Sequence, residues 1–265
     1  MNNILVLIDF TPVSEAILDQ AIKLGRFKGS SVTLSYVMHG SDKREDIEAK
    51  FEPYLAKFGA QGLICTVFIG EGNFKKAIAH YVTDNHPDLV LVATHGKKGL
   101  KQNLFGSNIY DLVKIVPSAV LVLGEHTAPV EGGFKKALLP AAPHANYLLK
   151  VAQTCEILSE TGEIVILNIT KTGVEQDPIT VENISKTKAF LDEKGIKWNY
   201  VEQDSHSFSV GYSKETLEYL SHENIDLVAI MAESSHAVGS LTPDMDKENI
   251  LHNEKGVAVL CANHE

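Results

Sequence analysis

The chain has 265 residues, 44% of them hydrophobic and 22% charged, which is typical of a globular protein with one large domain or two of ordinary size. A formal net charge of −10 argues against a general surface for nucleic acids or acidic membranes. No apolar run approaches the roughly 18 residues of a membrane span, and the first residues lack the basic segment of a signal peptide. We therefore expect a cytoplasmic protein that binds neither nucleic acid nor membrane.

Short β-branched runs alternate with helical segments along the whole chain, which is typical of βαβ units and parallel strands. The first half is predicted to contain, in chain order, the strand Ile4–Ile8, the helix Ser14–Lys28, the strand Ser31–Met38, the helix Lys43–Phe58, the strand Leu63–Ile69, the helix Phe74–Asn85, the strand Asp88–Ala93, the helix Asn108–Val116 and the strand Ala119–Leu123.

The second half repeats this order. Its predicted elements are the strand Lys136–Pro140, the helix Tyr147–Ser159, the strand Ile164–Ile169, the helix Val181–Lys194, the strand Trp198–Glu202, the helix Lys214–Glu223, the strand Asp226–Met231 and the strand Val257–Leu260.

Short phrases recur together with the elements. Asp88-Leu89-Val90 returns 138 residues later as Asp226-Leu227-Val228, and the apolar run at 120–123 returns 137 residues later at 257–260. Two distant phrases that share nearly one offset indicate an internal duplication. The stretch Gly124–Gly133 is polar and rich in Gly and Pro, so it is interpreted as a linker between domains 1–125 and 134–265.

A candidate phosphate site follows the strand Asp88–Ala93. Ala93-Thr94-His95-Gly96 is separated by nine residues from Gly106-Ser107-Asn108, where the next helix begins. Glycines allow backbone N–H groups to approach phosphate oxygens, and a helix N-terminus favours an anion. The loop between them carries Lys97, Lys98 and Lys101. On these residues alone, a flexible turn with Ser107 as an N-cap is the favoured interpretation.

The chain resembles the universal stress protein family, and specifically its tandem members. The family motif is Gly, two residues, Gly, nine residues, then Gly followed by Ser or Thr. Gly96, Gly106 and Ser107 match it, whereas Ala93 stands at the first Gly. The start, with Asp9 and Thr11 after an apolar strand, resembles the family's Asp-x-Ser/Thr corner, and Tyr36-Val37 resembles the end of its second strand.

The resemblance implies an α/β fold of two tandem, doubly wound domains with five-stranded, mostly parallel sheets of the adenine nucleotide alpha hydrolase type. It also implies that ATP or another adenine nucleotide binds the first half, with or without Mg²⁺. The implied site residues are Asp9, Val37, Ala93, Gly96, Gly106, Ser107 and Asn108. Asp9 would lie near the ribose, phosphates and metal, and Val37 would frame adenine through its backbone. A side chain at Ala93 is tolerated if φ is negative and crowds a phosphate if φ is positive. Asp9 could instead be only a turn or N-cap residue before the first helix.

The second half departs from this motif. Ala142 stands where the first half has Asp9, and Ala93-Thr94-His95-Gly96 corresponds to Met231-Ala232-Glu233-Ser234. Asp244 replaces Gly106, and with Glu233 and Asp246 it would place negative charge where phosphates should lie. The second half is predicted not to bind ATP. His236 and His252 flank this loop without compact ligand spacing, so no metal site is predicted.

The function that we expect is regulation or interaction in a stress response, through an adenine nucleotide and a protein partner that the sequence does not identify. A slow ATPase and a nucleotide-free scaffold are the alternatives, and no catalytic residue is predicted. The apolar strands Ala119–Leu123 and Val257–Leu260 resemble the family's dimerisation strands. We expect them to pair within the chain and to relate its halves by a pseudo-two-fold axis, which leaves open whether two chains also form a homodimer.

Overall fold

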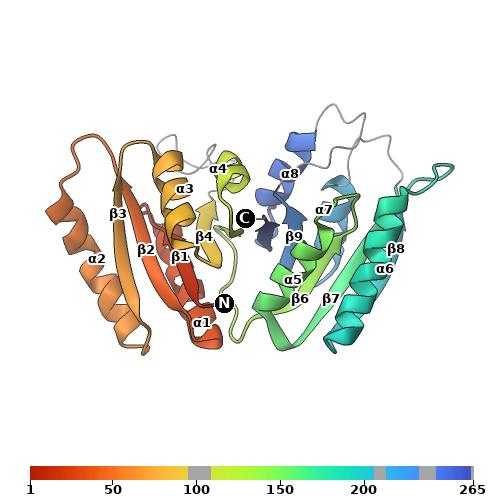
Figure 1. Cartoon of the computed structure of the whole chain (residues 1–265), viewed down its shortest axis with the longest axis horizontal. Coiled ribbons are helices and arrows are strands. Elements are labelled where there is room, and N and C mark those ends of the chain that lie inside the picture. Colours follow the sequence, from red (N-terminus) through yellow and green to blue (C-terminus); the bar gives the residue numbers. More distant parts are fainter. Residues whose placement is uncertain (95–108, 206–212, 233–242, 264–265) are drawn as a thin grey trace.

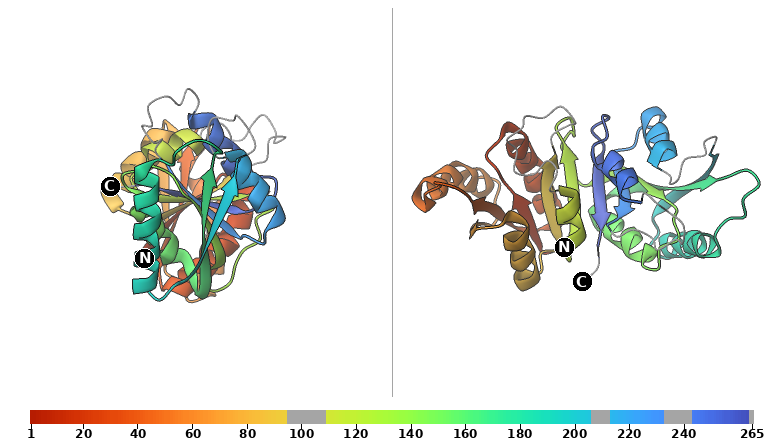
Figure 2. Two further views of the ribbon diagram at one scale, coloured as in Figure 1. Left: turned by 90° about the vertical axis from the view of Figure 1, so that its right-hand side faces the viewer. Right: turned by 90° about the horizontal axis from the view of Figure 1, so that it is seen from above.

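The computed structural model describes residues 1–94, 109–205, 213–232 and 243–263, and only the backbone of residues 243–246. Ten strands in these residues form one continuous sheet with the order β3-β2-β1-β4-β5-β10-β9-β6-β7-β8. Helices cover both faces of this sheet (Figure 1 and Figure 2). The architecture is therefore an α/β fold in which the two expected five-stranded sheets have merged into one.

The first half follows the predicted order, and its second strand and third helix have the predicted bounds. Its elements are β1 (Asn3–Leu7), α1 (Pro12–Lys28), β2 (Ser31–Met38), α2 (Arg44–Gly59), β3 (Cys65–Glu71), α3 (Phe74–Asn85), β4 (Leu89–Thr94), α4 (Ile109–Ile115) and β5 (Ala119–Gly124).

The second half contains one helix, α8, that the sequence did not predict, and its strand β7 begins six residues before the predicted Ile164. Its elements are β6 (Phe134–Pro140), α5 (Tyr147–Ile157), β7 (Leu158–Thr170), α6 (Pro178–Glu193), β8 (Lys197–Asp204), α7 (Ser213–His222), β9 (Leu227–Met231), α8 (Pro243–Leu251) and β10 (Ala258–Ala262).

The hydrophobic core lies in two layers, one on each face of the sheet. Along β1, Ile4 and Val6 belong to one layer, while Leu5 and Leu7 belong to the other. All four side chains are fully buried. Because helices cover both faces, a central parallel strand is apolar at every position, which explains the continuous hydrophobic runs in the sequence.

The two halves join through β5 and β10, which pair antiparallel with Val122 opposite Val259 and Val120 opposite Cys261. This confirms the predicted pairing of the two apolar strands. Each strand would otherwise leave an open sheet edge, so the pairing protects both edges. At the end of β10, the Asn263 side-chain amide donates hydrogen bonds to the carbonyls of Val113 and Val116 in the first half. We call this junction the seam.

The repeated Asp-Leu-Val phrase has a structural role in both halves. The Asp88 carboxylate accepts hydrogen bonds from the backbone N–H groups of Asn2 and Asn3 at 2.7 and 3.0 Å. The Asp226 carboxylate accepts from two N–H groups at the start of β6, at 2.8 and 2.9 Å. Each Asp thereby fixes the amino end of a neighbouring strand, and we refer to the two as the strand clamps.

The linker Gly124–Gly133 packs against the first half and is held there by hydrogen bonds. The Gln20 side chain accepts a hydrogen bond from the Val130 N–H at 2.9 Å, and Lys23 donates to the Pro129 carbonyl at 3.2 Å. At its end Gly133 has a φ of 91°, and a Cβ there would lie 2.8 Å from the Phe27 ring. Only glycine suits this close passage between the halves.

Candidate functional site

The site predicted from the sequence lies where the sheet changes its direction of winding. In the first half β1 lies between β2 and β4, and in the second half β6 lies between β7 and β9. The chain runs from β1 to β2 and from β4 to β5 in opposite directions across the sheet, as it does from β6 to β7 and from β9 to β10, and a crevice is expected outside the carboxyl ends of the strands at such a point. Open α/β sheets bind their ligands at such a point, and each half of this chain has one.

Asp9 lies two residues beyond β1, at this crevice in the first half. Its Oδ1 accepts hydrogen bonds from the Thr11 N–H at 3.1 Å and from the Thr11 hydroxyl at 2.6 Å. Thr11 is the N-cap of α1, because its hydroxyl oxygen accepts the Ser14 N–H at 3.3 Å. Asp9 is therefore a turn residue before the first helix, which is the alternative role that the sequence left open. Its hydrogen bonds with Thr11 fix the positions of both side chains.

The strand registers show what lies beside Asp9. Leu7 pairs with Ser35 of β2, and the Ile8 N–H continues this ladder by donating to the Ser35 carbonyl at 2.9 Å. Two residues further, the same register sets Asp9 opposite Val37. On the other side, the register that pairs Val6 with Leu91 sets Asp9 opposite Thr94 when it is extended. Asp9 therefore lies at the centre of this edge, between the ends of β2 and β4.

Val37 is 5% exposed, and its side chain packs in the core layer that also holds Leu5 and Leu7. Its side chain is therefore committed to the core, and its backbone is the part that could face a ligand. Contact of the Val37 backbone with adenine, which the family resemblance implies, stays a prediction.

Ala93 replaces the first glycine of the family motif without strain. It lies inside β4, where it pairs with Leu123, and it is 2% exposed. Among the described residues, the non-glycine positions with positive φ are Phe10 and His86, so Ala93 is not one of them. The crowding expected at positive φ does not arise at this backbone conformation.

The remaining predicted residues, Gly96, Gly106, Ser107 and Asn108, lie outside the described residues, as do His95 and the three loop lysines. The structure resumes at α4, whose Asp111 accepts a hydrogen bond from Lys75 of α3 at 2.9 Å. This bond, helped by the charge of Lys75, holds the pKa of the Asp111 carboxyl below its ordinary value. An ion pair thus ties α4 to α3.

Sequence reasoning missed an aromatic cluster next to Asp9, made of Phe10, Tyr36, Phe51 and Tyr54. The Phe10 ring lies 5.1 Å from Tyr36, 5.0 Å from Phe51 and 6.1 Å from Tyr54, measured between ring centres. Phe10 reaches this position with a φ of 57°, a conformation that its sequence does not signal. The cluster covers the end of β1 on the side of α2.

Tyr36 connects this cluster to polar groups. Its hydroxyl donates to Asp42 Oδ2 at 2.9 Å and lies 3.2 Å from His39 Nδ1. Burial, with the Asp42 bond and the charge of Asp9, raises the pKa of Tyr36 well above its ordinary value. The phenol therefore stays neutral and acts as a donor beside the crevice.

Asp9 is compatible with a bound metal or ribose hydroxyl, because a carboxylate has about four acceptor positions and Thr11 occupies two at Oδ1. Across the described ranges, no group of three or more His, Cys, Asp or Glu gathers in a way that could hold a metal ion alone. A cation here would therefore need ligands from the nucleotide itself, which is usual for Mg²⁺.

Comparison with known proteins decides the family. Residues 1–124 match the universal stress protein family. The first half of this chain belongs to that family. The length of 265 residues and the doubled order of elements fit a tandem of two such units. Among curated proteins, none matches the sequence of this chain.

Two solved structures share this fold over the full length of the chain. A universal stress protein from Archaeoglobus fulgidus aligns over 100% of this chain and 99% of its own, with a TM-score of 0.74 and 14% identity. A protein of unknown function from Pseudomonas aeruginosa aligns over 100% and 93%, with a TM-score of 0.67 and 13% identity. A universal stress protein family member from Arabidopsis thaliana, solved with AMP bound, covers 48% of this chain and 97% of its own, with a TM-score of 0.35 and 17% identity.

In the second half the equivalent edge differs from the universal stress protein pattern. Ala142 replaces Asp9, and its carbonyl accepts a hydrogen bond from Asn183 at 3.0 Å. Glu233 and the side chains of Asp244 and Asp246, where negative charge was predicted, lie outside the described residues. The structure instead brings two lysines to this edge, and sequence reasoning missed both.

The first of these lysines is Lys150, whose ammonium nitrogen lies 2.8 Å from the Pro140 carbonyl at the end of β6. The second is Lys247, which donates to the Ala232 carbonyl after β9 at 3.4 Å. A lysine between the apolar neighbours Leu149 and Val151 was the one available signal for the first. The second belongs to the helix α8, which was not predicted.

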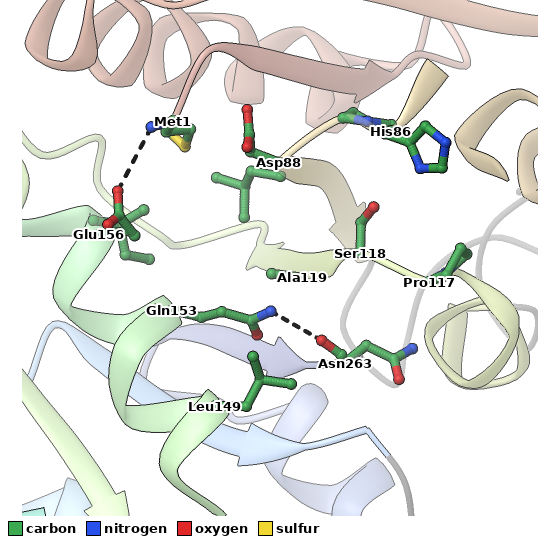
Figure 3. Close-up of a pocket in the computed structure, with 13 residues that line it drawn as sticks. Met1, His86, Asp88, Pro117, Ser118, Ala119, Leu149, Gln153, Glu156 and Asn263 are labelled. Carbon is green, nitrogen blue, oxygen red and sulfur yellow. Dashed lines mark hydrogen bonds and ion pairs between the residues drawn. The ribbon is translucent and has the colours of Figure 1, made fainter. Parts of the chain in front are cut away.

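A cavity of about 540 Å³ lies at the opposite end of the strands (Figure 3). Its lining includes Met1, Asp88 and Ala119 at the amino ends of β1, β4 and β5, together with Gln153 of α5. Gln153 donates to the Asn263 carbonyl at 2.9 Å, and both belong to the second half, whereas Met1, Asp88 and Ala119 belong to the first, so residues from both halves meet in the cavity. This cavity belongs to the seam and not to the ligand edge.

Within the described part of the chain, no helix is long and apolar enough to span a membrane.

Proposed function

We propose that this chain is a regulatory protein that binds ATP, or another adenine nucleotide, in its first half at the carboxyl ends of β1 and β4. The observation that carries the proposal is Asp9, which is held rigidly at the switch point of a half that belongs to the universal stress protein family. The nucleotide would be stoichiometric at one per chain, and the function would be a response to stress through a protein partner.

In this proposal each site residue has a role that follows from its chemistry. The Asp9 carboxylate accepts ribose hydroxyl groups or binds a metal ion, and the Val37 backbone borders adenine. Backbone N–H groups at Gly96, Gly106 and Ser107 bind phosphate oxygens, with Asn108 beside them at the start of α4. Mg²⁺, when bound, would neutralise phosphate charge. The aromatic cluster excludes water on the side of α2.

Hydrolysis is not needed for this function. In the proposed complex the free oxygen of Asp9 is taken by the ribose or a metal ion, and Tyr36 is kept neutral by its raised pKa, so we assign neither as a base that activates water. The phosphate released by purified protein in the presence of ATP is therefore expected to stay at background. Release above background that disappears in Asp9→Ala would favour the alternative of a slow ATPase.

Titration calorimetry with ATP, with and without Mg²⁺, tests the proposal. Wild-type protein is expected to bind ATP saturably and more tightly than GTP. Asp9→Asn keeps an acceptor for Thr11 but removes the charge, and should weaken binding by about tenfold or more while unfolding stays unchanged. Asp19→Asn, an exposed carboxylate on α1 paired with Lys57, is the matched control. Absence of saturable heat at millimolar ATP would refute nucleotide binding and leave the scaffold alternative.

The division of the chain into a nucleotide-binding domain, 1–125, and a second domain without ATP, 134–265, is part of the same proposal. The strand clamps Asp88 and Asp226 support it, because each half fixes its own central strand without the other. Cytoplasmic localisation, expected from the sequence, is also part of the proposal, and further association of two chains is left open.

A further inference from the structure

A second cavity lies between the two halves, at the amino ends of β7 and β8. Its volume is about 500 Å³, which is within the range of small-molecule sites. Phe27 and Lys28 at the end of α1 line it from the first half, and residues at the ends of α5 and α6 line it from the second. A Cβ built at Gly133 would lie 2.8 Å from both the Phe27 ring and the Ser159 nitrogen, so the two walls approach each other closely. We call this space the junction cavity.

One wall of the junction cavity is an irregular stretch of β7. Phe134 pairs with Leu158 and Lys136 pairs with Glu163, so two steps along β6 correspond to five steps along β7. In the first half, the register of β1 and β2 continues without such a shift. A bulge takes residues out of the ladder and changes the direction of their side chains. The bulge residues 159–162 all line the junction cavity, so the second half has built this wall from chain that the first half lacks.

A buried hydroxyl on this bulge has no hydrogen-bond partner. Within the described part of the chain, Ser159 Oγ makes no hydrogen bond although it is shielded from solvent. Buried polar groups are normally hydrogen-bonded, and the exceptions are often explained by a water, an ion or a ligand. Ser159 as a whole is only partly buried, so rotation about χ1 turns its hydroxyl toward the cavity that the residue lines. The bulge thus offers a hydroxyl donor to a ligand.

Three lysines from different elements also line the junction cavity, namely Lys28 of α1, Lys194 after α6 and Lys197 of β8. Among the described lining residues the one carboxylate is Glu160, so the lining has a formal charge of +2 in a chain whose net charge is −10. Ion pairs within the described ranges involve none of the three lysines. Burial raises the pKa of the Cys155 thiol on the wall from α5 to about 11, and the charge of Lys194 opposes this rise, which places that charge at the cavity.

Carboxylates near the junction cavity do not cancel this charge. Glu193 is exposed at the end of α6 and is not among the lining residues. The others have partners elsewhere: Glu163 pairs with Lys136 at 3.4 Å, Asp192 with the Trp198 indole at 2.8 Å and Glu156 with the Met1 amine at 3.6 Å. The junction cavity is therefore a cationic site within an acidic protein, and its chemistry selects an anion.

The arrangement of the cations indicates which anion fits. Lysines reach the junction cavity from three elements, and the cavity is larger than a single phosphate group, so the ligand needs acidic groups at more than one place. An ammonium group acts as a point charge that suits phosphate, whereas planar carboxylates are matched best by arginine. The described lining contains no arginine.

We propose that the junction cavity binds a compact oligophosphate, that is, a small molecule with two or more phosphoryl groups. The Ser159 hydroxyl donates to one phosphoryl oxygen, and the ammonium groups of Lys28, Lys194 and Lys197 bind the others. Because the lining comes from both halves, the bound ligand stabilises the pair of halves by mass action. This site is separate from the edge that carries Asp9, so it acts whether or not a nucleotide is bound there.

Titration calorimetry of the full chain with inorganic tripolyphosphate, without Mg²⁺, tests the proposal. Wild-type protein should bind it saturably, with an affinity that falls as salt rises. Lys28→Met and Lys197→Met should each lower the affinity by about fivefold. Ser159→Ala should lower it by about tenfold without lowering the free energy of unfolding, since the hydroxyl has no protein partner to lose. Lys186→Met, an exposed lysine paired with Glu182, is the matched control and should leave the affinity unchanged.

Three results would overturn the proposal. The first is an absence of saturable binding, or binding that Ser159→Ala and both lysine variants leave unchanged, because either would mean diffuse attraction between charges. The second is citrate binding as tightly as tripolyphosphate, which would remove the preference for phosphate. The third is loss of tripolyphosphate binding in Gly106→Asp but not in Lys28→Met, which would assign the ligand to the first-half site. The expected pattern is the reverse, so this test can fail while the nucleotide proposal stands.

Discussion

At its carboxyl edge the first half presents Asp9 after β1, held by Thr11 and bordered by the aromatic cluster. At the same place in the second half, Ala142 follows β6, and Lys150 and Lys247 donate to the carbonyls at the strand ends. One edge carries a fixed carboxylate, while the other carries two amines. Among the described residues, the duplicated units have therefore diverged in the ionisable side chains that they place at this edge.

The amino ends of the same strands did not diverge. Asp88 and Asp226 make the same pair of backbone hydrogen bonds, and the apolar strands beside them keep their pattern. The comparison teaches that residues which set the strand frame were retained in both halves, while residues at the ligand edge changed freely. A fold keeps what its sheet requires, and function resides in the edge that the sheet exposes.

We expect the largest loss of stability from a substitution in the seam, because pairing of β5 with β10 determines whether each half is stable alone or only together with the other half. Val122→Asp would bury a carboxylate opposite Val259 and should lower the free energy of unfolding by about 4 kcal/mol or more. Val122→Thr keeps the shape and should cost about 1–2 kcal/mol. Urea unfolding and hydrogen exchange of the β5 and β10 amides measure this. Unchanged exchange in Val122→Asp would show that the seam contributes nothing to the stability of either half.

A charge placed in the first half should copy the predicted defect of the second. Gly106→Asp sets a carboxylate against the phosphates, and like charges about 4 Å apart repel by about 4 kcal/mol at an effective dielectric constant near 20. We expect ATP affinity to fall at least about 100-fold in calorimetry. Gly106→Asn has the same size without the charge and should bind more tightly than Gly106→Asp. Equal affinities of these two variants would mean that sterics, and not charge, separate the halves.

The strand clamps should be equivalent in energy if the duplication preserved the frame. Asp88→Ala and Asp226→Ala each remove two charge-assisted backbone hydrogen bonds and should each cost about 1–3 kcal/mol in denaturant unfolding. Because the two sites are in different halves, the double variant should show the sum within about 0.5 kcal/mol. Asp88→Asn keeps an acceptor and should cost less. If either Asp→Ala substitution leaves the free energy of unfolding unchanged, the two strand clamps are not equivalent.

The smallest expected change in stability comes from the ion pair between Lys75 of α3 and Asp111 of α4 in the first half. Lys75 lowers the pKa of Asp111, so its contribution is present above the ordinary carboxyl pKa near 4 and is lost as pH falls through the lowered value. Both side chains are partly exposed, so the difference between wild type and Lys75→Met should be below about 1 kcal/mol at pH 7. Thermal unfolding from pH 7 to pH 3 should show this difference vanish. Lys76→Met, at the next residue, should give a difference that does not depend on pH.

The sequence by itself determined the order of strands and helices in the first half, the internal repeat, and the pairing of Ala119–Leu123 with Val257–Leu260. These features follow from hydrophobic periodicity and from apolar runs. Both are local signals, because each can be recognised within a short stretch of consecutive residues. It also located Asp9, Val37 and Ala93 at strand ends, because motif spacing fixes the position of a residue relative to its own strand. The residues at 96 and 106–108 stay predictions.

Only the tertiary structure decided which groups meet across elements. It paired the repeated Asp residues with strand ends about 90 residues away in sequence, at 85 and 91 residues for Asn3 and Lys135. It gave Phe10 a positive φ so that its ring joins α2, and it set Lys150 under the end of β6 near a lysine from α8. Such contacts depend on the order of the strands in the sheet and on which surfaces are buried together. No local pattern in the chain predicts these contacts.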